Sequence, residues 1–342
     1  MKKRRINLAL QGGGAHGAFT WGVLDRLLEE QDIEIAAISG TSAGALNAAA
    51  LKAGYVRGGR EGARENLDWF WGEVDRADDF QVRNWFTFWP EVMMRTMRAF
   101  TPAAALDGLS HLVSPYDYGP FYADPLRKIV ESLHFDQICV PEGPALFISA
   151  TNVRTGKIRV FSGAGISVDA LMASACLPTV FRAVEIDDPA TGRREAYWDG
   201  GYAGNHSLFP LYDPALPQDV VIVNINPIVR DEVPHIAADI LNRINEVSFN
   251  ASLLSELRAI NFVRRLIADG KIERHSMKDV FVHMIADDEL MNRLGAETKL
   301  LPTTGMLAEL KAAGRKAAAS FLRKHGDKIN QTSSVDLAAA YS

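Results

Sequence analysis

The 342-residue sequence predicts an α/β fold of three layers, with helices on both faces of a mostly parallel central sheet. Two apolar runs, at 6–10 and 35–39, lead to this prediction. Each reads as a buried strand that is followed by a glycine-containing turn and a segment with helical spacing. Parallel strands joined through helices produce this pattern. With 47% hydrophobic and 23% charged residues, the chain has the composition of a globular protein with a sizeable core.

The second of these strands ends in the motif that organises the sequence. Gly40, Ser42 and Gly44 fit the G-x-S-x-G nucleophile elbow, and an alanine-rich helix follows at 45–51. A serine on such a strand-to-helix turn lies in a strained backbone region, so its neighbours must be small. Its hydroxyl would point out at the end of the sheet, with the helix N-terminus behind it. We therefore interpret Ser42 as a nucleophile.

The first strand leads into a glycine loop at Gly12, Gly13 and Gly14, before a segment with helical spacing at 18–30. Together with Gly17 this loop also satisfies G-x-G-x-x-G, the dinucleotide-binding pattern. That pattern needs a carboxylate near the end of the second strand, where this sequence has none. An oxyanion hole is favoured instead, because the N–H groups of such a turn can converge on a developing negative charge. A parallel sheet would place this loop beside the elbow.

A third signal comes at the end of the segment 196–198, which leads into Asp199, Gly200 and Gly201. A carboxylate followed by two glycines at a strand end forms a sharp turn that exposes the acid. Asp-Gly is also an ordinary turn dipeptide, so the motif alone leaves both a turn and a catalytic acid open.

Apolar runs and helical spacing predict the elements between these motifs. We expect helices at 61–74, 124–133 and 168–175, strands at 145–150, 157–161 and 220–225, and a loop at 108–122. The tract at 84–100 is the most aromatic and apolar of the chain. It is interpreted either as core packing or as a lid or lipid-facing surface.

The composition disfavours several classes of protein. The net charge is −5 and no basic stripe is interleaved with aromatic residues, so no nucleic-acid partner is expected. Cys139 and Cys176 are expected to be buried free thiols in a reducing compartment. The basic start at 2–5 is followed by too short an apolar run for an export segment, and no window approaches a transmembrane helix in length. We therefore expect a cytoplasmic protein.

The three motifs together resemble those of the patatin-like phospholipase family. The glycine loop resembles its oxyanion loop, Gly40-Thr41-Ser42-Ala43-Gly44 its elbow, and Asp199-Gly200-Gly201 its catalytic aspartate motif. The segment Ala173-Ser174-Ala175-Cys176-Leu177-Pro178, with Phe181, also resembles the Ala-Ser-rich segment that precedes the aspartate in that family. The resemblance covers residues 6–226 in the right order.

The resemblance implies a catalytic dyad of Ser42 and Asp199, an oxyanion hole of Gly12, Gly13 and Gly14, and no metal or other cofactor. It implies hydrolysis of lipid acyl esters. We predict phospholipids or lysophospholipids as the substrates, with peripheral contact at the inner membrane face. The expected organisation is a catalytic domain at 1–230 and a mainly helical region at 231–342 packed on it. Within the latter we expect one or two amphipathic helices at 236–267, a strand-like run at 280–285, a helix at 307–324 and a loose tail.

One position departs from the family pattern. His16 stands in the glycine loop where many relatives carry arginine or lysine, so a fixed positive charge beside the oxyanion is in doubt. A histidine there could make the activity sensitive to pH.

Three rival interpretations stay open on the sequence alone. A Ser–His–Asp triad is formally available because His206, His235 and His283 follow Asp199, although the elbow comes earlier than the α/β-hydrolase order usually places it. A lipid-binding or regulatory protein without turnover would be free to lose Ser42 and Asp199, which are intact. An esterase or acyltransferase acting on another lipid ester would use the same acyl-enzyme. The oligomeric state is not predicted.

Overall fold

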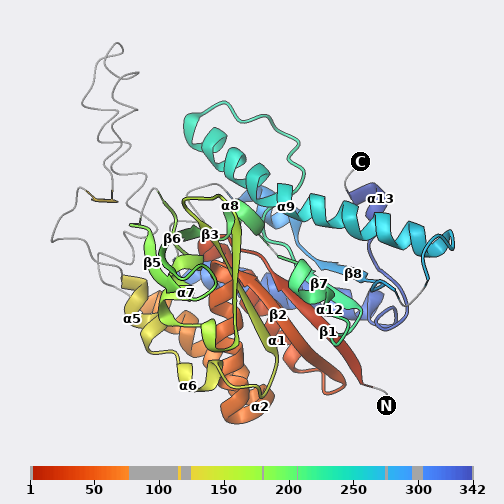
Figure 1. The fold of residues 1–342 in the computed structure, drawn as a ribbon, viewed down its shortest axis with the longest axis horizontal. Coiled ribbons are helices and arrows are strands. Elements are labelled where there is room, and N and C mark those ends of the chain that lie inside the picture. The colour runs from red at the N-terminus through yellow and green to blue at the C-terminus, as the bar shows by residue number, and fades with distance from the viewer. Residues whose placement is uncertain are drawn as a thin grey trace.

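A computed structural model describes residues 3–76, 115–116, 125–178, 181–205, 207–273, 276–294 and 303–340. In these ranges one eight-stranded sheet has the order β5-β6-β3-β2-β1-β7-β8, with β4 pairing with β3 (Figure 1). The strands are β1 (Arg4–Leu10), β2 (Ile33–Thr41), β3 (Ala145–Asn152), β4 (Ile158–Ser162), β5 (Val184–Asp188), β6 (Arg193–Asp199), β7 (Asp219–Val223) and β8 (Phe281–Ile285). The expected loop at 108–122, apart from 115–116, and the aromatic tract at 84–100 lie outside the described residues.

The sheet is mostly parallel, as predicted. β1 pairs in parallel with β2 and β7, β2 with β3, and β7 with β8, whereas β4, β5 and β6 form the antiparallel end. The sequence analysis did not predict β5. Its burial alternates between half-buried and exposed along a charged run, so no buried apolar run marks it as a strand.

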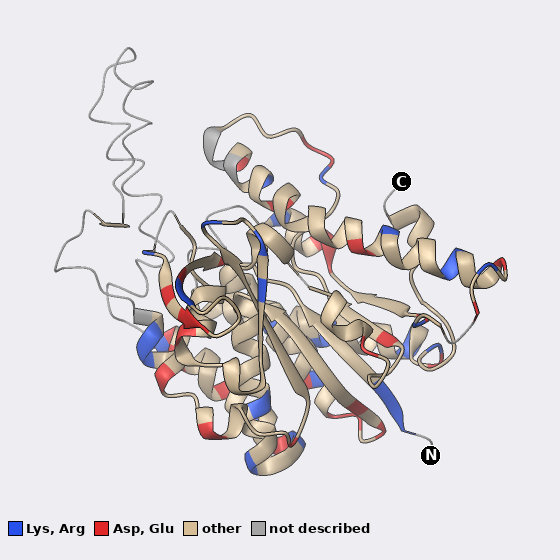
Figure 2. Cartoon of the chain, viewed as in Figure 1, with Lys and Arg blue, Asp and Glu red and all other residues tan. Residues whose placement is uncertain are grey.

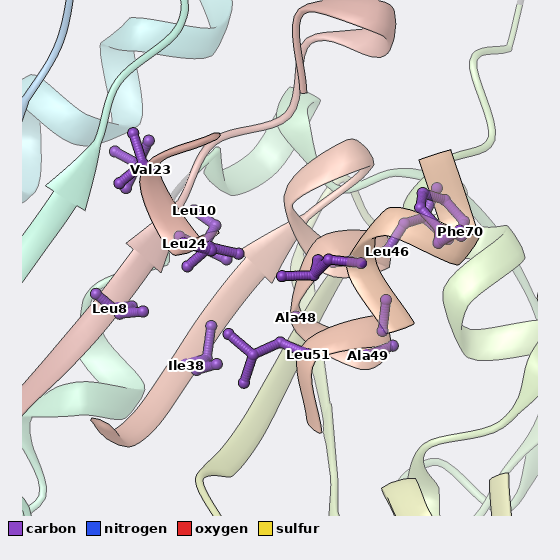
Figure 3. Close-up of a cluster of buried hydrophobic side chains, with 14 of the residues drawn as sticks. Leu8, Leu10, Val23, Leu24, Ile38, Leu46, Ala48, Ala49, Leu51 and Phe70 are labelled. Carbon is purple, nitrogen blue, oxygen red and sulfur yellow. The ribbon is translucent and has the colours of Figure 1, made fainter. Parts of the chain in front are cut away.

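Helices cover both faces of the sheet, so the three-layer prediction is confirmed. Alternate residues of each strand face opposite layers: Leu8 and Leu10 belong to one buried cluster, and Ala9 between them belongs to another. The larger cluster packs against α1 (Gly17–Leu28) and α2 (Ala43–Arg76), as Figure 3 shows. The smaller one packs against α9 (Ala237–Ala268) through Leu253 and Leu257.

The remaining helices are shorter or lie near the chain's end. They are η1 (Gly14–His16), α5 (Pro125–Glu131), α6 (Phe135–Ile138), η4 (Gly163–Gly165), α7 (Val168–Ser174), α8 (Gly201–Gly204), η5 (Phe209–Tyr212), α10 (Asp288–Arg293), α12 (Thr304–His325) and α13 (Leu337–Ala340). The long α2 is interrupted at Gly58 and Gly59, whose backbones are not helical. The helix after the elbow and the expected helix at 61–74 are therefore its two halves.

The residues after 230 take part in the same sheet. They supply β8 at its edge, and α12 packs directly on α1. A Cβ atom on Gly22 would lie 2.0 Å from the carbonyl oxygen of Lys311, and one on Gly314 would lie 2.0 Å from that of Phe19. These two glycines allow the helices to touch through their backbones, so an alanine at either position would push the helices apart.

Acidic and basic residues are interspersed over the described part of the chain rather than gathered by sign (Figure 2). Arg4 and Arg5 at the start of β1 are both neutralised, by Asp32 at 2.8 Å and Glu34 at 2.9 Å. Among the described helices, none is both long and apolar enough to span a bilayer.

Candidate active site

The strand register brings the two expected catalytic residues together. Along β3, Thr41 at the end of β2 lies opposite Ser149, and Asp199 at the end of β6 lies opposite the next residue, Ala150. β4 occupies the other edge of β3 at both positions. β2 and β6 therefore run toward each other along one edge and end there, which places Ser42 and Asp199 at the same junction.

Ser42 has the backbone of a nucleophile elbow. Its φ is +53°, in the left-handed region that residues other than glycine rarely adopt. A Cβ on Gly40 would lie 2.7 Å from the carbonyl oxygen of Gly44, and one on Gly44 would lie 2.2 Å from that of Leu10. The turn is therefore closed to larger residues on both sides. The Ser42 side chain remains slightly accessible, with 8% of the residue exposed.

Asp199 is buried beside this serine. Its Oδ1 accepts a hydrogen bond from the backbone N–H of Gly201 at 2.7 Å, and its Oδ2 has no hydrogen-bond partner among the described residues. Burial raises the pKa of Asp199 to about 7, although the Gly201 N–H and the nearby Ser42 hydroxyl both act to lower it. A carboxylate whose pKa is near neutrality suits a general base far better than one with the ordinary value of about 4.

The two glycines after Asp199 are required by close packing. A Cβ on Gly200 would lie 2.2 Å from the carbonyl oxygen of Ser149, and one on Gly201 would lie 2.9 Å from the ring of Phe249. The edge of the Phe249 ring is also in contact with Tyr202, at 5.5 Å between ring centroids. These contacts wall the Asp199 side of the site with aromatic rings.

The glycine loop lies directly against Ser42. A Cβ on Gly12 would lie 2.7 Å from that of Ser42. The N–H of Gly12 donates to Oδ1 of Asn205 at 2.8 Å, so this amide is already occupied. No described residue accepts a hydrogen bond from the N–H groups of Gly13 or Gly14, where η1 begins. Of the three expected oxyanion-hole amides, those of Gly13 and Gly14 are the available pair.

Buried amide side chains hold this loop, and the sequence analysis missed them. Oε1 of Gln11 accepts the N–H groups of Ile225 and Asn226, each at 2.7 Å. Nδ2 of Asn226 donates to the carbonyl oxygen of Gly12 at 2.8 Å, and Nε2 of Gln11 donates to Asn250 on α9 at 3.0 Å. Single asparagines in loops look like ordinary turn residues in a sequence, so no local pattern marks this network.

The turn at the end of α7 contacts both candidate catalytic residues through hydrogen bonds. Oγ of Ser174 accepts the N–H of Ser42 at 2.9 Å, and its carbonyl oxygen accepts the N–H of Gly200 at 3.2 Å. The carbonyl oxygen of Cys176 accepts the N–H of Asp199 at 2.7 Å. The Ala-Ser-rich segment pointed to this region, but only the structure assigns Ser174 a positioning role.

Replacing Ser174 by alanine is expected to lower kcat about 10–100-fold with little change in KM, because the Ser42 backbone loses the acceptor that holds its left-handed conformation. Steady-state kinetics on an ester substrate measures this. Ser167→Ala is the matched control, because Ser167 caps the same helix through the N–H of Ala170 and does not touch Ser42. An equal decrease of kcat in the two variants would show that Ser174 only stabilises the helix and does not position Ser42.

The histidines of the triad alternative occupy other places. The ring nitrogens of His283 bond to Asp219 at 2.9 Å and to Ser334 at 3.0 Å, so both are engaged away from Ser42. His235 lies exposed before α9, and His206 is outside the described residues. His16 is buried at the end of η1, in the glycine loop. In the described ranges, no group of three or more histidines, cysteines or acids is placed to hold a metal ion.

Solved structures to which the chain is similar come from several organisms. The chain is similar to VipD from Legionella pneumophila at 15% identity and a TM-score of 0.44, covering 95% of this chain and 67% of that one. It is similar to ExoU from Pseudomonas aeruginosa, solved with SpcU, at 14% identity and a TM-score of 0.29, covering 94% of this chain and 53% of that one.

A human group IVD cytosolic phospholipase A2, solved with methyl γ-linolenyl fluorophosphonate, is similar at 16% identity and a TM-score of 0.25. That match covers 46% of this chain and 22% of the human one, so the chain spans about a fifth of that protein and about half of ExoU. No curated protein matches the sequence. The family model of patatin-like phospholipases matches residues 8–212, which is more than half of the chain and includes Ser42 and Asp199. The chain belongs to the patatin-like phospholipase family.

Proposed function

We propose that this chain is a serine acyl hydrolase that cleaves phospholipids or lysophospholipids with Ser42 as nucleophile and Asp199 as base. Membership of the family supports a lipid acyl hydrolase. The observation that carries the finer proposal is the buried Asp199 beside Ser42, with Oδ2 unpartnered among the described residues and a pKa of about 7. This oxygen is the one that can take the serine proton.

The reaction follows from this geometry in two steps. Oγ of Ser42 attacks the ester carbonyl while Oδ2 of Asp199 accepts its proton, and the Gly13 and Gly14 amides bind the oxyanion. Collapse expels the alcohol, which takes the proton from Asp199, and leaves the acyl-enzyme. Water then attacks the acyl carbon, gives its proton to Asp199, and releases the fatty acid as Ser42 recovers its hydrogen. No other co-reactant is needed.

Two accompanying proposals concern the setting of the reaction. Cys176 is buried as expected, whereas Cys139 is only half-buried, and neither forms a disulfide, which supports a reducing compartment such as the cytoplasm. The substrate resides in a bilayer, which supports peripheral contact with a membrane surface.

A release assay on the purified protein tests the proposed function. Fatty acid release from phospholipid, lysophospholipid and a short-chain ester is compared with that of Ser42→Ala, which provides the blank for each substrate. We expect release by the wild type alone, with the larger kcat/KM on one of the two phospholipid classes. Acyl transfer to an added alcohol that outpaces release would identify an acyltransferase instead. Lipid binding without turnover of any ester would contradict the proposal.

A further inference from the structure

Six of the eleven large apolar side chains that are exposed in the described residues fall within one stretch, 229–247. They are Val229 (66% exposed), Val233 (73%), Ile236 (62%), Ile240 (41%), Ile244 (57%) and Val247 (53%). The last four recur at spacings of four, four and three residues, so they line one side of the first half of α9. We call these six residues the α9 stripe. Such a concentration marks an interaction surface.

The α9 stripe reverses the usual pattern of a surface helix. An ordinary amphipathic helix turns its apolar residues to the core and its charged residues to water. Here Glu246 is buried, paired with Arg230 at 2.8 Å and with Arg243 at 3.4 Å, and the isoleucines face outward. Glu246 is therefore neutralised by Arg230 and Arg243, while the isoleucines of this part of the helix are exposed.

The same helix contacts both halves of the active site. Phe249 packs against Gly201 beside Asp199, and Asn250 bonds to Gln11 at the base of the glycine loop. These two residues face the site, so the α9 stripe looks away from it across one helix diameter, about 10 Å. Figure 1 shows the first half of α9 projecting beyond the neighbouring elements, beside α8. A surface that covered the stripe would therefore contact the helix that packs against Gly201 and bonds to Gln11.

The local charge indicates which kind of surface fits. Between 229 and 247 the sequence has two arginines and four acids, a balance of −2 with histidine neutral. Of the acids, Asp231, Glu232 and Asp239 are exposed, whereas both arginines are paired with Glu246. An anionic surface would be repelled, so attraction must come from burying the apolar side chains.

The basic N-terminus offers no rival membrane contact. Arg4 and Arg5 are ion-paired with Asp32 and Glu34, and they start β1, whose far end leads into the glycine loop. Six residues of strand separate Arg4 from that loop, a distance of about 20 Å. A bilayer contacting the arginines would lie at the starting ends of the parallel strands, whereas Ser42 follows the other end of β2.

We infer that the α9 stripe docks the protein on the surface of a neutral, zwitterionic phospholipid bilayer, with the isoleucines inserted among the lipids. The inference rests on the proposed function, because a lipid hydrolase must reach a substrate held in a bilayer. It adds which face meets the membrane and which lipid charge is preferred. Docking by this face would place the helix that contacts Gly201 and Gln11 against the bilayer.

The test measures co-sedimentation with phosphatidylcholine vesicles in a Ser42→Ala background, so that binding is read without turnover. Ile240→Ser/Ile244→Ser is expected to weaken binding at least 10-fold, since two inserted side chains become polar. Isoleucine and serine have similar helix propensities, so α9 should stay folded. Met277→Ser is the matched control. Met277 is 49% exposed and lies before the start of β8, outside the α9 stripe, so its replacement should leave binding unchanged.

A second variant keeps the inference falsifiable if the serine protein is perturbed. Ile240→Lys/Ile244→Lys should lose binding to phosphatidylcholine and gain salt-sensitive binding to vesicles containing phosphatidylglycerol. Wild-type binding to those anionic vesicles should be no stronger than to neutral ones. Unchanged binding by both double variants, or a wild type that does not bind neutral vesicles, would overturn the inference. So would a wild-type dimer in the absence of lipid that these substitutions break.

Catalysis is read separately from docking. In protein that keeps the native Ser42, Ile240→Ser/Ile244→Ser should lower hydrolysis of vesicle phospholipid about 10-fold. Hydrolysis of a monomeric short-chain ester should be unchanged. Absence of hydrolysis on every ester would contradict the proposed function while leaving the vesicle-binding result to be judged by itself. Equal hydrolysis of vesicles by wild type and variant would contradict the docking inference alone.

Discussion

Replacing Asp199 by asparagine is expected to lower kcat on every ester substrate by about 10³-fold, within the range for removal of a general base. The asparagine side chain has nearly the same volume and can still accept the Gly201 N–H, but it cannot take the proton of Ser42. The wild-type kcat should rise with pH through about 7 and level off, because Asp199 must be deprotonated to act. The residual rate of Asp199→Asn should lack this rise.

The thermal stability of Asp199→Asn shows whether its lower kcat comes from unfolding. The folded-state pKa of Asp199 lies above its unfolded value near 4, so between pH 4 and 7 the folded protein binds more protons at this site than the unfolded one. Asp199 therefore contributes a loss of stability as pH rises through that window. Thermal unfolding at pH 8 should show Asp199→Asn at least as stable as the wild type. A near-full rate in Asp199→Asn would contradict the dyad and make His16 the next candidate base.

The second large effect is expected far from the active site, where His283 and Asp219 form a buried pair. Asp219→Ala should lower the free energy of unfolding by about 3 kcal/mol, because it strands the His283 ring nitrogen and the N–H of Asn330 without their acceptor. Ser334 on the other ring nitrogen shows that this pair ties the C-terminal segment to the sheet. Urea unfolding measures the change.

The control for this pair is an exposed one on α10. Glu289 and Arg293 are 3.2 Å apart with side chains 87% and 64% exposed, and Glu289→Ala should cost about 0.5 kcal/mol or less. Folded Asp219→Ala protein should retain wild-type kcat, because Asp219 lies at the start of β7 whereas Ser42 follows the end of the parallel strand β2. A loss from Asp219→Ala no larger than that from Glu289→Ala would show that the pair does not stabilise the fold.

The sequence predicts the parts of the site that are local and misses those that depend on register. Gly40, Ser42 and Gly44 lie within five consecutive positions, so their small side chains predict the turn without any other part of the chain. Asp199 is identifiable only through its family motif, because its approach to Ser42 depends on the ends of β2 and β6 meeting opposite Ser149 and Ala150. No pattern within a short window contains that information.

The same reasoning explains the other omissions. Ser174 and Asn205 act on residues 132 and 193 positions away, so their partners are not visible in their own neighbourhoods. The expected loose tail contains α13, whose Leu337 is buried against α9 although this helix is only four residues long. Tertiary contact, rather than local preference, determines structure at such positions.

The left-handed backbone of Ser42 has a consequence for how this active site persists through generations of mutation. A residue with a side chain held at φ +53° costs about 1–3 kcal/mol that glycine would not. The same mutation that removes the nucleophile, Ser42→Gly, would therefore also relieve the fold. In a lineage that no longer needs the reaction, selection for a stable fold would therefore not oppose the loss of this serine.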